Sequence, residues 1–266
     1  MTNNSPSNHP LLEAWGSFLP QQPPYLLAGD EVLLEPEVRD KWTCSLDGWS
    51  QYVAQDDARS VKAGRLQLGL LPMPFAGDLL RARAYVLLLN PGWEPLDYFA
   101  EWEVPAFRAA VLANYAQAPS HGMFFLDPQF AWHGGGRYWN GRLKGVITAL
   151  SARLAIPHRS ARQRLQQDVC VLEMFAYHSA EWRLPSRIEA RLRSSELVRT
   201  FVHDVLQPRA SAGEATIIVT RKCSEWGLRP GRGIVVYEGM SRRGAHIGPT
   251  SRGGAALLEQ LARDDR

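Results

Sequence analysis

The chain has 266 residues, of which 45% are hydrophobic and 21% are charged, a composition typical of one large globular domain with a full core. It contains no run of about 18 uninterrupted apolar residues, and its polar start lacks the basic-then-apolar pattern of an export signal, so membrane insertion and export are not expected. The formal net charge is +3, with arginines in excess in the second half; this half either attracts an anionic partner or carries solvated, arginine-rich helix faces.

The three cysteines argue against a disulfide framework and against a zinc knuckle. Cys44, Cys170 and Cys223 are odd in number and widely spaced, so we expect a reducing, cytoplasmic location. No set of His, Cys, Asp and Glu has the spacing of metal ligands, and we therefore expect a site without a metal or another cofactor.

The first part of the chain has few regular signals. Residues 1–30 are rich in Pro, Asn, Ser and Gln, which predicts a loose arm that docks locally. The remaining residues, 31–266, are expected to form a single domain. Within it, the segment RLQLGLLPMPFAG fits either a strand pair or an irregular loop, because prolines and glycines interrupt it.

Four near-continuous apolar runs then follow in chain order, at residues 84–90, 169–177, 215–221 and 233–239. Such runs are typical of strands that are covered on both faces. Helix-like stretches at 141–154, 194–206 and 253–265 are long enough to connect parallel strands. The pattern predicts an α/β fold, a three-layer α/β/α sandwich with a four-stranded, mostly parallel central sheet.

Ligands in such folds gather at the carboxyl ends of the strands. This rule selects four loops as the candidate site: Asn90-Pro91-Gly92-Trp93, Tyr177-His178-Ser179, Arg221-Lys222 and Gly239-Met240-Ser241.

The first of these loops resembles a known motif. LLLNPGW is similar to the first motif of the uracil-DNA glycosylase superfamily, whose mismatch-specific and single-strand-selective branches read G-x-N-P-G after a buried strand. The residues that match are Asn90, Pro91 and Gly92, whereas Leu88 replaces the family's glycine. The resemblance covers roughly residues 80–266.

Two later segments extend the resemblance. Residues 136–139, Gly-Arg-Tyr-Trp, are similar to a segment of the mismatch-specific branch that leads into a helix. The last predicted strand runs into the place of the second motif, which is Asn-Pro-Ser or His-Pro-Ser in the family. Here Gly239 and Met240 replace its first two residues and only Ser241 matches in type, so another group must steady the leaving base.

The resemblance implies a DNA glycosylase that hydrolyses the N-glycosidic bond of a damaged, mismatched or modified base, as in base excision repair with base flipping. The residues are consistent with this chemistry, because an amide oxygen such as that of Asn90 can orient the attacking water without acting as a base. His178 and His246 are the candidates to donate to the departing base. The structural alternative is an Asn-Pro-Gly turn that simply ends a strand.

Base capture and DNA binding need further groups. We expect a base to be held by a fixed turn and an aromatic ring, and the candidates are Pro91, Gly92, Trp93, Tyr98 and Tyr138, although each aromatic ring also fits a core position. Phosphate contacts are expected from Ser241, Arg242, Arg243, Arg221 and Lys222, although such loop arginines also serve solubility.

Other functions remain open at this point. The main alternative is a non-catalytic protein that keeps the glycosylase fold and binds DNA or a base. A nucleophilic hydrolase built on His178 and Ser179 lacks the G-x-S-x-G elbow, and a nucleotide-binding enzyme lacks both a P-loop and a G-x-G-x-x-G turn after a strand.

Overall fold

The computed structural model of the chain describes residues 8–55, 64–118, 122–237 and 246–263. The chain folds into two compact units. The first unit comprises residues 1–74, 90–116 and 173–200, and the second comprises 75–89, 117–172 and 201–266. In the described part of the chain, every helix is too short or too polar to cross a membrane.

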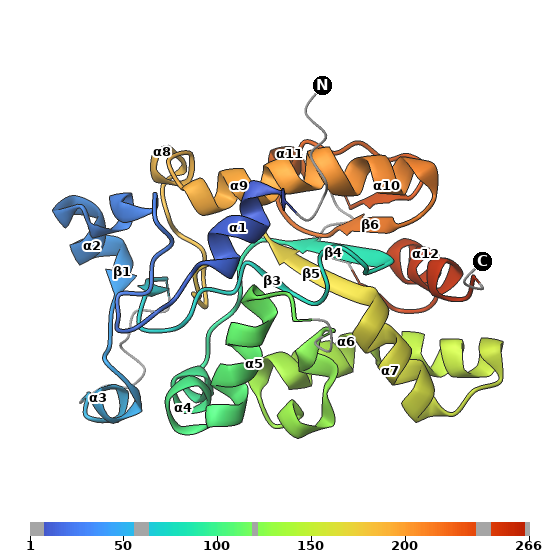
Figure 1. Cartoon of the computed structure of the whole chain (residues 1–266), viewed down its shortest axis with the longest axis horizontal. Coiled ribbons are helices and arrows are strands. Elements are labelled where there is room, and N and C mark those ends of the chain that lie inside the picture. Colours follow the sequence, from blue (N-terminus) through green and yellow to red (C-terminus); the bar gives the residue numbers. More distant parts are fainter. Residues whose placement is uncertain (1–7, 56–63, 119–121, 238–245, 264–266) are drawn as a thin grey trace. The chain divides into compact units, whose positions relative to one another are not determined.

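The second unit contains a five-stranded sheet in the order β3-β5-β4-β6-β7 (Figure 1). Four of its strands lie within the predicted apolar runs: β4 (Ala84–Leu88), β5 (Val169–Glu173), β6 (Thr216–Val219) and β7 (Ile234–Val236). β6 pairs in parallel with both β4 and β7, so the protein is a mixed α/β protein with a mostly parallel sheet.

The prediction of four strands is wrong by one. β3 (Phe75–Ala76) pairs antiparallel with β5 and forms the edge of the sheet. It is only two residues long and lies between Pro74 and Gly77, in the segment whose structure the sequence left open. A proline cannot donate to a sheet ladder, so β3 cannot extend toward Pro74 as a regular central strand.

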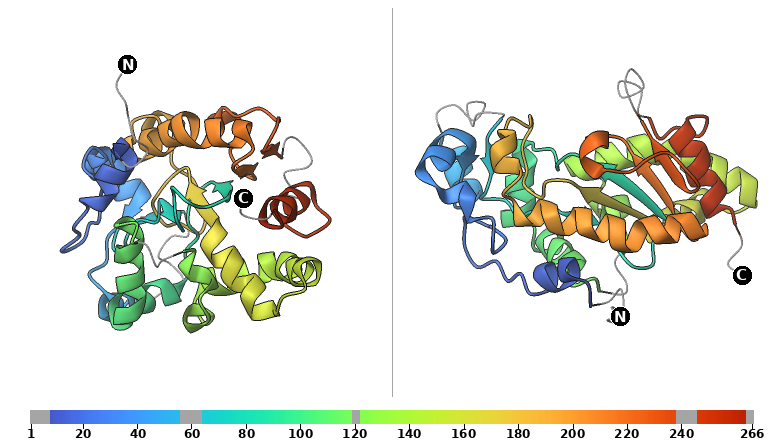
Figure 2. Two further views of the ribbon diagram at one scale, coloured as in Figure 1. Left: turned by 45° about the vertical axis from the view of Figure 1, so that its right-hand side comes forward. Right: turned by 90° about the horizontal axis from the view of Figure 1, so that it is seen from above.

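Helices α10 and α12 pack against this sheet (Figure 2). α10 (Gln207–Ala212) contacts β6 and β7, and α12 (Arg252–Leu261) contacts β4, β6 and β7. The predicted helix at 253–265 is therefore present in its described residues, and its apolar side chains Leu257 and Leu261 are buried. The other elements of this unit are η3 (Phe124–Leu126), η4 (Pro128–Phe130), α6 (Gly134–Leu154), α7 (His158–Asp168), the π-helix η5 (Val202–Leu206) and α11 (Cys223–Trp226).

The elements of the first unit are mostly short. They are α1 (Pro10–Gly16), η2 (Glu31–Leu34), α2 (Pro36–Trp42), β1 (Thr43–Cys44), α3 (Trp49–Val53), β2 (Leu66–Gln67), α4 (Pro95–Glu103), α5 (Pro105–Tyr115), α8 (Ser186–Glu189) and most of α9 (Arg193–Phe201). β1 and β2 pair in parallel.

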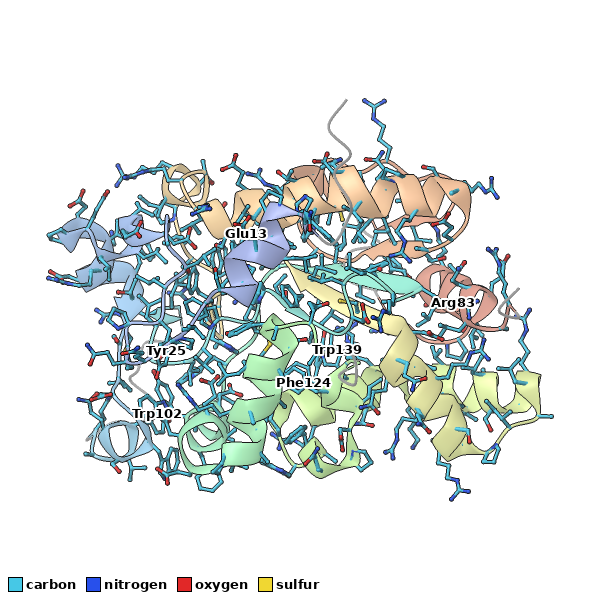
Figure 3. The ribbon with its side chains drawn as sticks, in the orientation of Figure 1. Glu13, Tyr25, Arg83, Trp102, Phe124 and Trp139 are labelled. Atoms are coloured by element: carbon cyan, nitrogen blue, oxygen red, sulfur yellow. The ribbon has the colours of Figure 1, made fainter. Side chains whose placement is uncertain are left out.

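Aromatic side chains supply much of the packing in the first unit. Tyr25 and Trp102, labelled in Figure 3, stack at 6.4 Å between ring centroids, and the Arg108 guanidinium lies within 5.8 Å of both rings. In the N-terminal arm, Trp15 of α1 is fully buried and stacks on Tyr115 of α5. Burial of such large rings is a main source of packing energy, so α1 is docked within the first unit.

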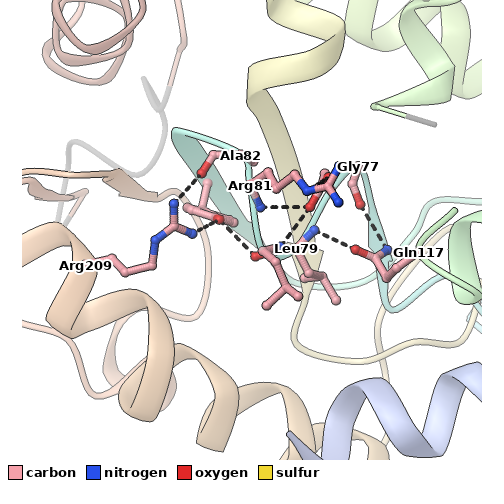
Figure 4. Close-up of polar contacts among 9 residues, drawn as sticks. Gly77, Leu79, Arg81, Ala82, Gln117 and Arg209 are labelled. Atoms are coloured by element: carbon pink, nitrogen blue, oxygen red, sulfur yellow. Dashed lines mark hydrogen bonds and ion pairs between the residues drawn. The ribbon is translucent and has the colours of Figure 1, made fainter. Parts of the chain in front are cut away.

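The connection from β3 to β4 is held by polar contacts (Figure 4). Gln117 accepts from the Leu79 amide at 2.7 Å and donates to the Gly77 carbonyl at 3.2 Å. On the opposite side, Arg209 of α10 donates to the Ala82 carbonyl at 3.1 Å. These bonds satisfy backbone groups that the sheet does not pair, and they fix the point at which β4 begins.

Candidate functional site

The Asn90 amide is tied to the loop that follows β5. Its Nδ2 lies 2.8 Å from the Pro91 carbonyl, 3.2 Å from the Ser179 carbonyl and 3.1 Å from Ser179 Oγ. In return, the Ser179 amide donates to the Pro91 carbonyl at 3.2 Å. Two of the four loops selected from the sequence are thus joined in the first unit.

These contacts decide which way the amide faces. Carbonyl oxygens only accept, so the nitrogen of Asn90 must point toward the two carbonyls and the oxygen must point away from them. No described residue donates to Asn90 Oδ1, and Asn90 is half-buried rather than enclosed. The site therefore presents a fixed acceptor oxygen that a water can reach.

The buried side chain of His178 contacts the same turn. Its Nδ1 lies 2.8 Å from the Gly92 carbonyl and its Nε2 lies 3.1 Å from the Leu71 carbonyl, and the side chain is 6% exposed. A neutral imidazole carries a single N–H and can donate to only one of these two carbonyls. Donation to both carbonyls at once requires a proton on each ring nitrogen. Since carbonyls occupy both nitrogens, His178 holds the turn in this structure and does not offer a donor to a departing base.

A buried carboxyl completes this polar network. Glu101 is 2% exposed, and its Oε2 accepts from the Leu71 amide at 2.7 Å. Burial raises the pKa of Glu101 well above its ordinary value; the bond from Leu71 opposes this shift and the nearby Asp97 adds to it. The backbone of Leu71 thus links the two side chains, with its N–H bonded to Glu101 and its carbonyl in contact with His178.

The two aromatic rings expected near this turn have different surroundings. Tyr98 is fully buried, stacks on Tyr52 and donates to Gln67 Oε1 at 3.2 Å, so its ring supports the core and is closed to a base. Trp93 is half-buried and packs edge-on against Tyr52, and its Nε1 has no hydrogen-bond partner among the described residues. Of these two rings, Trp93 is the one a ligand can still reach.

Glu173, the last residue of β5, is a buried carboxyl that the sequence reasoning did not include among the predicted site residues. It is 7% exposed, and within the described residues its Oε2 has no hydrogen-bond partner. Burial alone raises its pKa well above the ordinary value. The signal in the sequence that points to it is an acidic residue inside the apolar run at residues 169–177.

The other predicted site residues that the structure describes lie in the second unit. Tyr138 and His246 line one groove. Lys222 forms an ion pair with Glu225 at 3.2 Å, and Arg221 is exposed beside it. Ser241, Arg242 and Arg243 lie outside the described residues, as do Gly239 and Met240.

The groove also contains residues that the sequence reasoning missed as a site. Arg137 and Arg142 line it together with Gly141. The signal that could have found them is a run of basic residues without an acidic residue around a glycine in mid-helix. Among the described residues, no group of three or more His, Cys, Asp and Glu side chains is arranged to hold a metal ion.

Comparison of the chain with protein-family models, curated proteins and solved structures gives no match.

Proposed function

We propose that the protein is a DNA glycosylase that hydrolyses the N-glycosidic bond of a damaged, mismatched or modified base. The observation that carries the proposal is the orientation of the Asn90 amide, whose nitrogen is held by the Pro91 and Ser179 carbonyls while no described residue donates to its oxygen. An acceptor fixed in this way can orient a water for attack.

In the proposed reaction, water held by Asn90 Oδ1 attacks the sugar carbon that carries the base. The bond from that carbon to the base nitrogen breaks, and its electron pair leaves with the base. The water becomes the new hydroxyl of the sugar, and its proton goes to solvent or to the departing base. Asn90 takes no proton, so its contribution is positioning and electrostatics.

The turn next to Asn90 has room for a substrate. Gly92 is exposed, and a Cβ built on it would meet no described atom within 4 Å. A backbone without a side chain permits a close approach of sugar or base. The half-buried Trp93 follows directly and supplies a candidate ring for an extruded base, which must recover the stacking that it loses.

His178 has a positioning role in this proposal. It keeps the Gly92 carbonyl and the Leu71 carbonyl in place beneath the turn.

The fold proposed with this function is a three-layer α/β/α sandwich of the uracil-DNA glycosylase type. The parallel pairing of β4, β6 and β7 and the packing of α10 and α12 on their strands support it. In this proposal, the Asn-Pro-Gly turn that follows β4 corresponds to the first motif of the superfamily.

The test is an abasic-site assay with purified protein and labelled oligonucleotides that carry uracil, mismatched, deaminated or hypermodified bases, followed by alkali. We expect the wild type to produce abasic sites on at least one substrate and Asn90→Ala to produce none. Ser179→Ala removes only one of the acceptors that hold the amide, so its rate should fall roughly 2- to 12-fold, the equivalent of one ordinary hydrogen bond.

The same assay separates the enzyme from a binding protein that keeps this fold. DNA binding without an abasic site on any substrate would refute the enzyme and support the non-catalytic alternative. Equal activity of the wild type and Asn90→Ala would remove Asn90 from the mechanism.

A further inference from the structure

The second unit contains a groove of about 610 Å³ between the first turns of α6 and the segment that precedes α12. Arg137, Tyr138 and Arg142 line it from α6, and His246 and Gly248 line it from the other side. Its volume lies within the range of sites that hold small organic ligands, about 300–1,000 Å³, and is much larger than a lone phosphate needs.

The groove lies in the most basic part of the chain. Between residues 128 and 167 the sequence has seven basic side chains and no Asp or Glu. They are Arg137, Arg142, Lys144, Arg153, Arg159, Arg162 and Arg164. With two guanidinium groups lining the groove, an anionic ligand is favoured.

The groove also offers an aromatic surface. Tyr138 is 44% exposed, although large aromatic side chains are usually buried. The Arg142 guanidinium lies 4.9 Å from the centroid of its ring. Aromatic rings and guanidinium planes are the groups on which nucleobases stack, so the ligand that fits this lining has both an anionic group and a flat ring.

Gly141 keeps the groove open. A glycine inside a helix lowers helix stability relative to alanine. A Cβ on Gly136 would lie 2.0 Å from the Phe130 carbonyl and one on Gly145 would lie 2.8 Å from Pro249, so packing explains these two glycines. A Cβ on Gly141 would meet no described atom within 4 Å, so packing does not explain this one.

The opposite wall of the groove is held in place. The His246 carbonyl accepts from Tyr237 Oη at 3.0 Å and from Ser251 Oγ at 2.7 Å. Ser251 also caps α12 by accepting from the Gly254 amide at 3.1 Å. These bonds connect the segment around His246 to β7 and to α12, so the wall is set before a ligand arrives.

We propose that this groove binds a nucleotide, with the phosphate at Arg137 and Arg142 and the base on Tyr138. The nucleotide is either free or one unit of a single strand, since both offer the same phosphate and base. The site lies wholly in the second unit and does not depend on the Asn90 chemistry.

Calorimetric titration of the full chain tests the proposal with four probes: deoxyadenosine monophosphate, deoxyadenosine, inorganic phosphate and a short single-stranded oligodeoxyadenylate. We expect the monophosphate to bind more tightly than deoxyadenosine or phosphate. Tyr138→Ala should weaken its binding roughly 5- to 150-fold, which is the loss expected for one stacked base, and Gly141→Leu should abolish it by filling the groove.

The contribution of the two groove arginines is tested against a control pair of basic residues on the same helix. Arg137→Glu with Arg142→Glu changes the net charge as much as Lys144→Glu with Arg153→Glu, and the second pair lies outside the groove. Only the first pair should abolish nucleotide binding. Thermal melts check folding, and Gly141→Leu is expected to keep α6 intact because leucine is a better helix former than glycine.

The probes also distinguish the two sources of the nucleotide. Equal affinity for the monophosphate and the oligonucleotide indicates a free nucleotide. Tighter binding of the oligonucleotide to the wild type, with an affinity that falls as salt rises by a log–log slope of about 0.7 for each phosphate contacted, indicates a single strand. The proposal is overturned if no probe binds, if phosphate alone binds as tightly as the monophosphate, or if Tyr138→Ala binds like the wild type.

Discussion

Glu173 gives a stability prediction that follows directly from its surroundings. The side chain is 7% exposed, and its Oε2 has no hydrogen-bond partner among the described residues. Glu173→Gln keeps the size and shape of the side chain and removes only its ability to ionise. The variant therefore isolates the energetic effect of burying an ionisable group at the end of β5.

The sign of the effect follows from the pKa. Burial raises the pKa of Glu173 above the ordinary value of 4.5, so the folded state holds the proton more tightly than the unfolded state. The stability that this proton contributes is fully present below pH 4.5 and is lost as the pH rises toward the folded-state pKa. Within that window the free energy of unfolding of the wild type falls by about 1.4 kcal/mol per pH unit relative to Glu173→Gln.

Urea denaturation of both proteins across the range from about pH 4.5 to 7.5 measures this difference. Every other titrating group is common to the two proteins, so subtracting their free energies of unfolding isolates Glu173. We expect the advantage of Glu173→Gln to grow with pH. A difference that stays constant across the series would contradict this prediction, since it would mean that Glu173 ionises as easily in the folded protein as in the unfolded chain.

Three further substitutions give separate predictions. Tyr177→Phe removes the hydroxyl that donates to the buried Asp30 carboxyl at 2.5 Å, and urea denaturation should show a loss of about 1.5–3 kcal/mol; an unchanged free energy of unfolding would contradict it. His178→Ala removes the buried ring that contacts the Gly92 and Leu71 carbonyls, so the free energy of unfolding should fall by about 1–3 kcal/mol in the same assay; an unaltered midpoint would contradict this. Gly141→Ala should stabilise the protein by about 1 kcal/mol in a thermal melt, because its Cβ meets no described atom within 4 Å; destabilisation would show that this space is occupied.

Four of the five strands of the sheet were predictable from the sequence, because a strand that is buried on both faces is a nearly continuous run of apolar residues. β4, β5, β6 and β7 all lie within the predicted runs. The segment that contains β3 was left open between a strand pair and an irregular loop, because two residues beside a proline carry no periodicity of their own and the pairing with β5 depends on tertiary contacts. The helix at 194–206 was predicted from its apolar spacing, but its π-helical turn at Val202–Leu206 has no such signal.

The candidate site was predictable only in part. Topology brought the Asn90 turn and the loop at residues 177–179 together, since both follow neighbouring strands. The direction of the Asn90 amide was not predictable, because it depends on the distances of its nitrogen from the Pro91 and Ser179 carbonyls. The burial of Tyr98 could not be predicted from the sequence either, since an aromatic residue near a loop fits either a core position or a site position.

In the proposed reaction, Asn90 orients the water that releases a base. The most direct test of this role measures, under single-turnover conditions, the rate at which wild type and Asn90→Ala release free base from the best oligonucleotide substrate, with DNA affinity measured in parallel. We predict a fall in the rate of at least about 100-fold in Asn90→Ala, the scale of losing a positioned reactant, with DNA affinity retained. Equal rates in the two proteins, or no free base from either, would contradict the account.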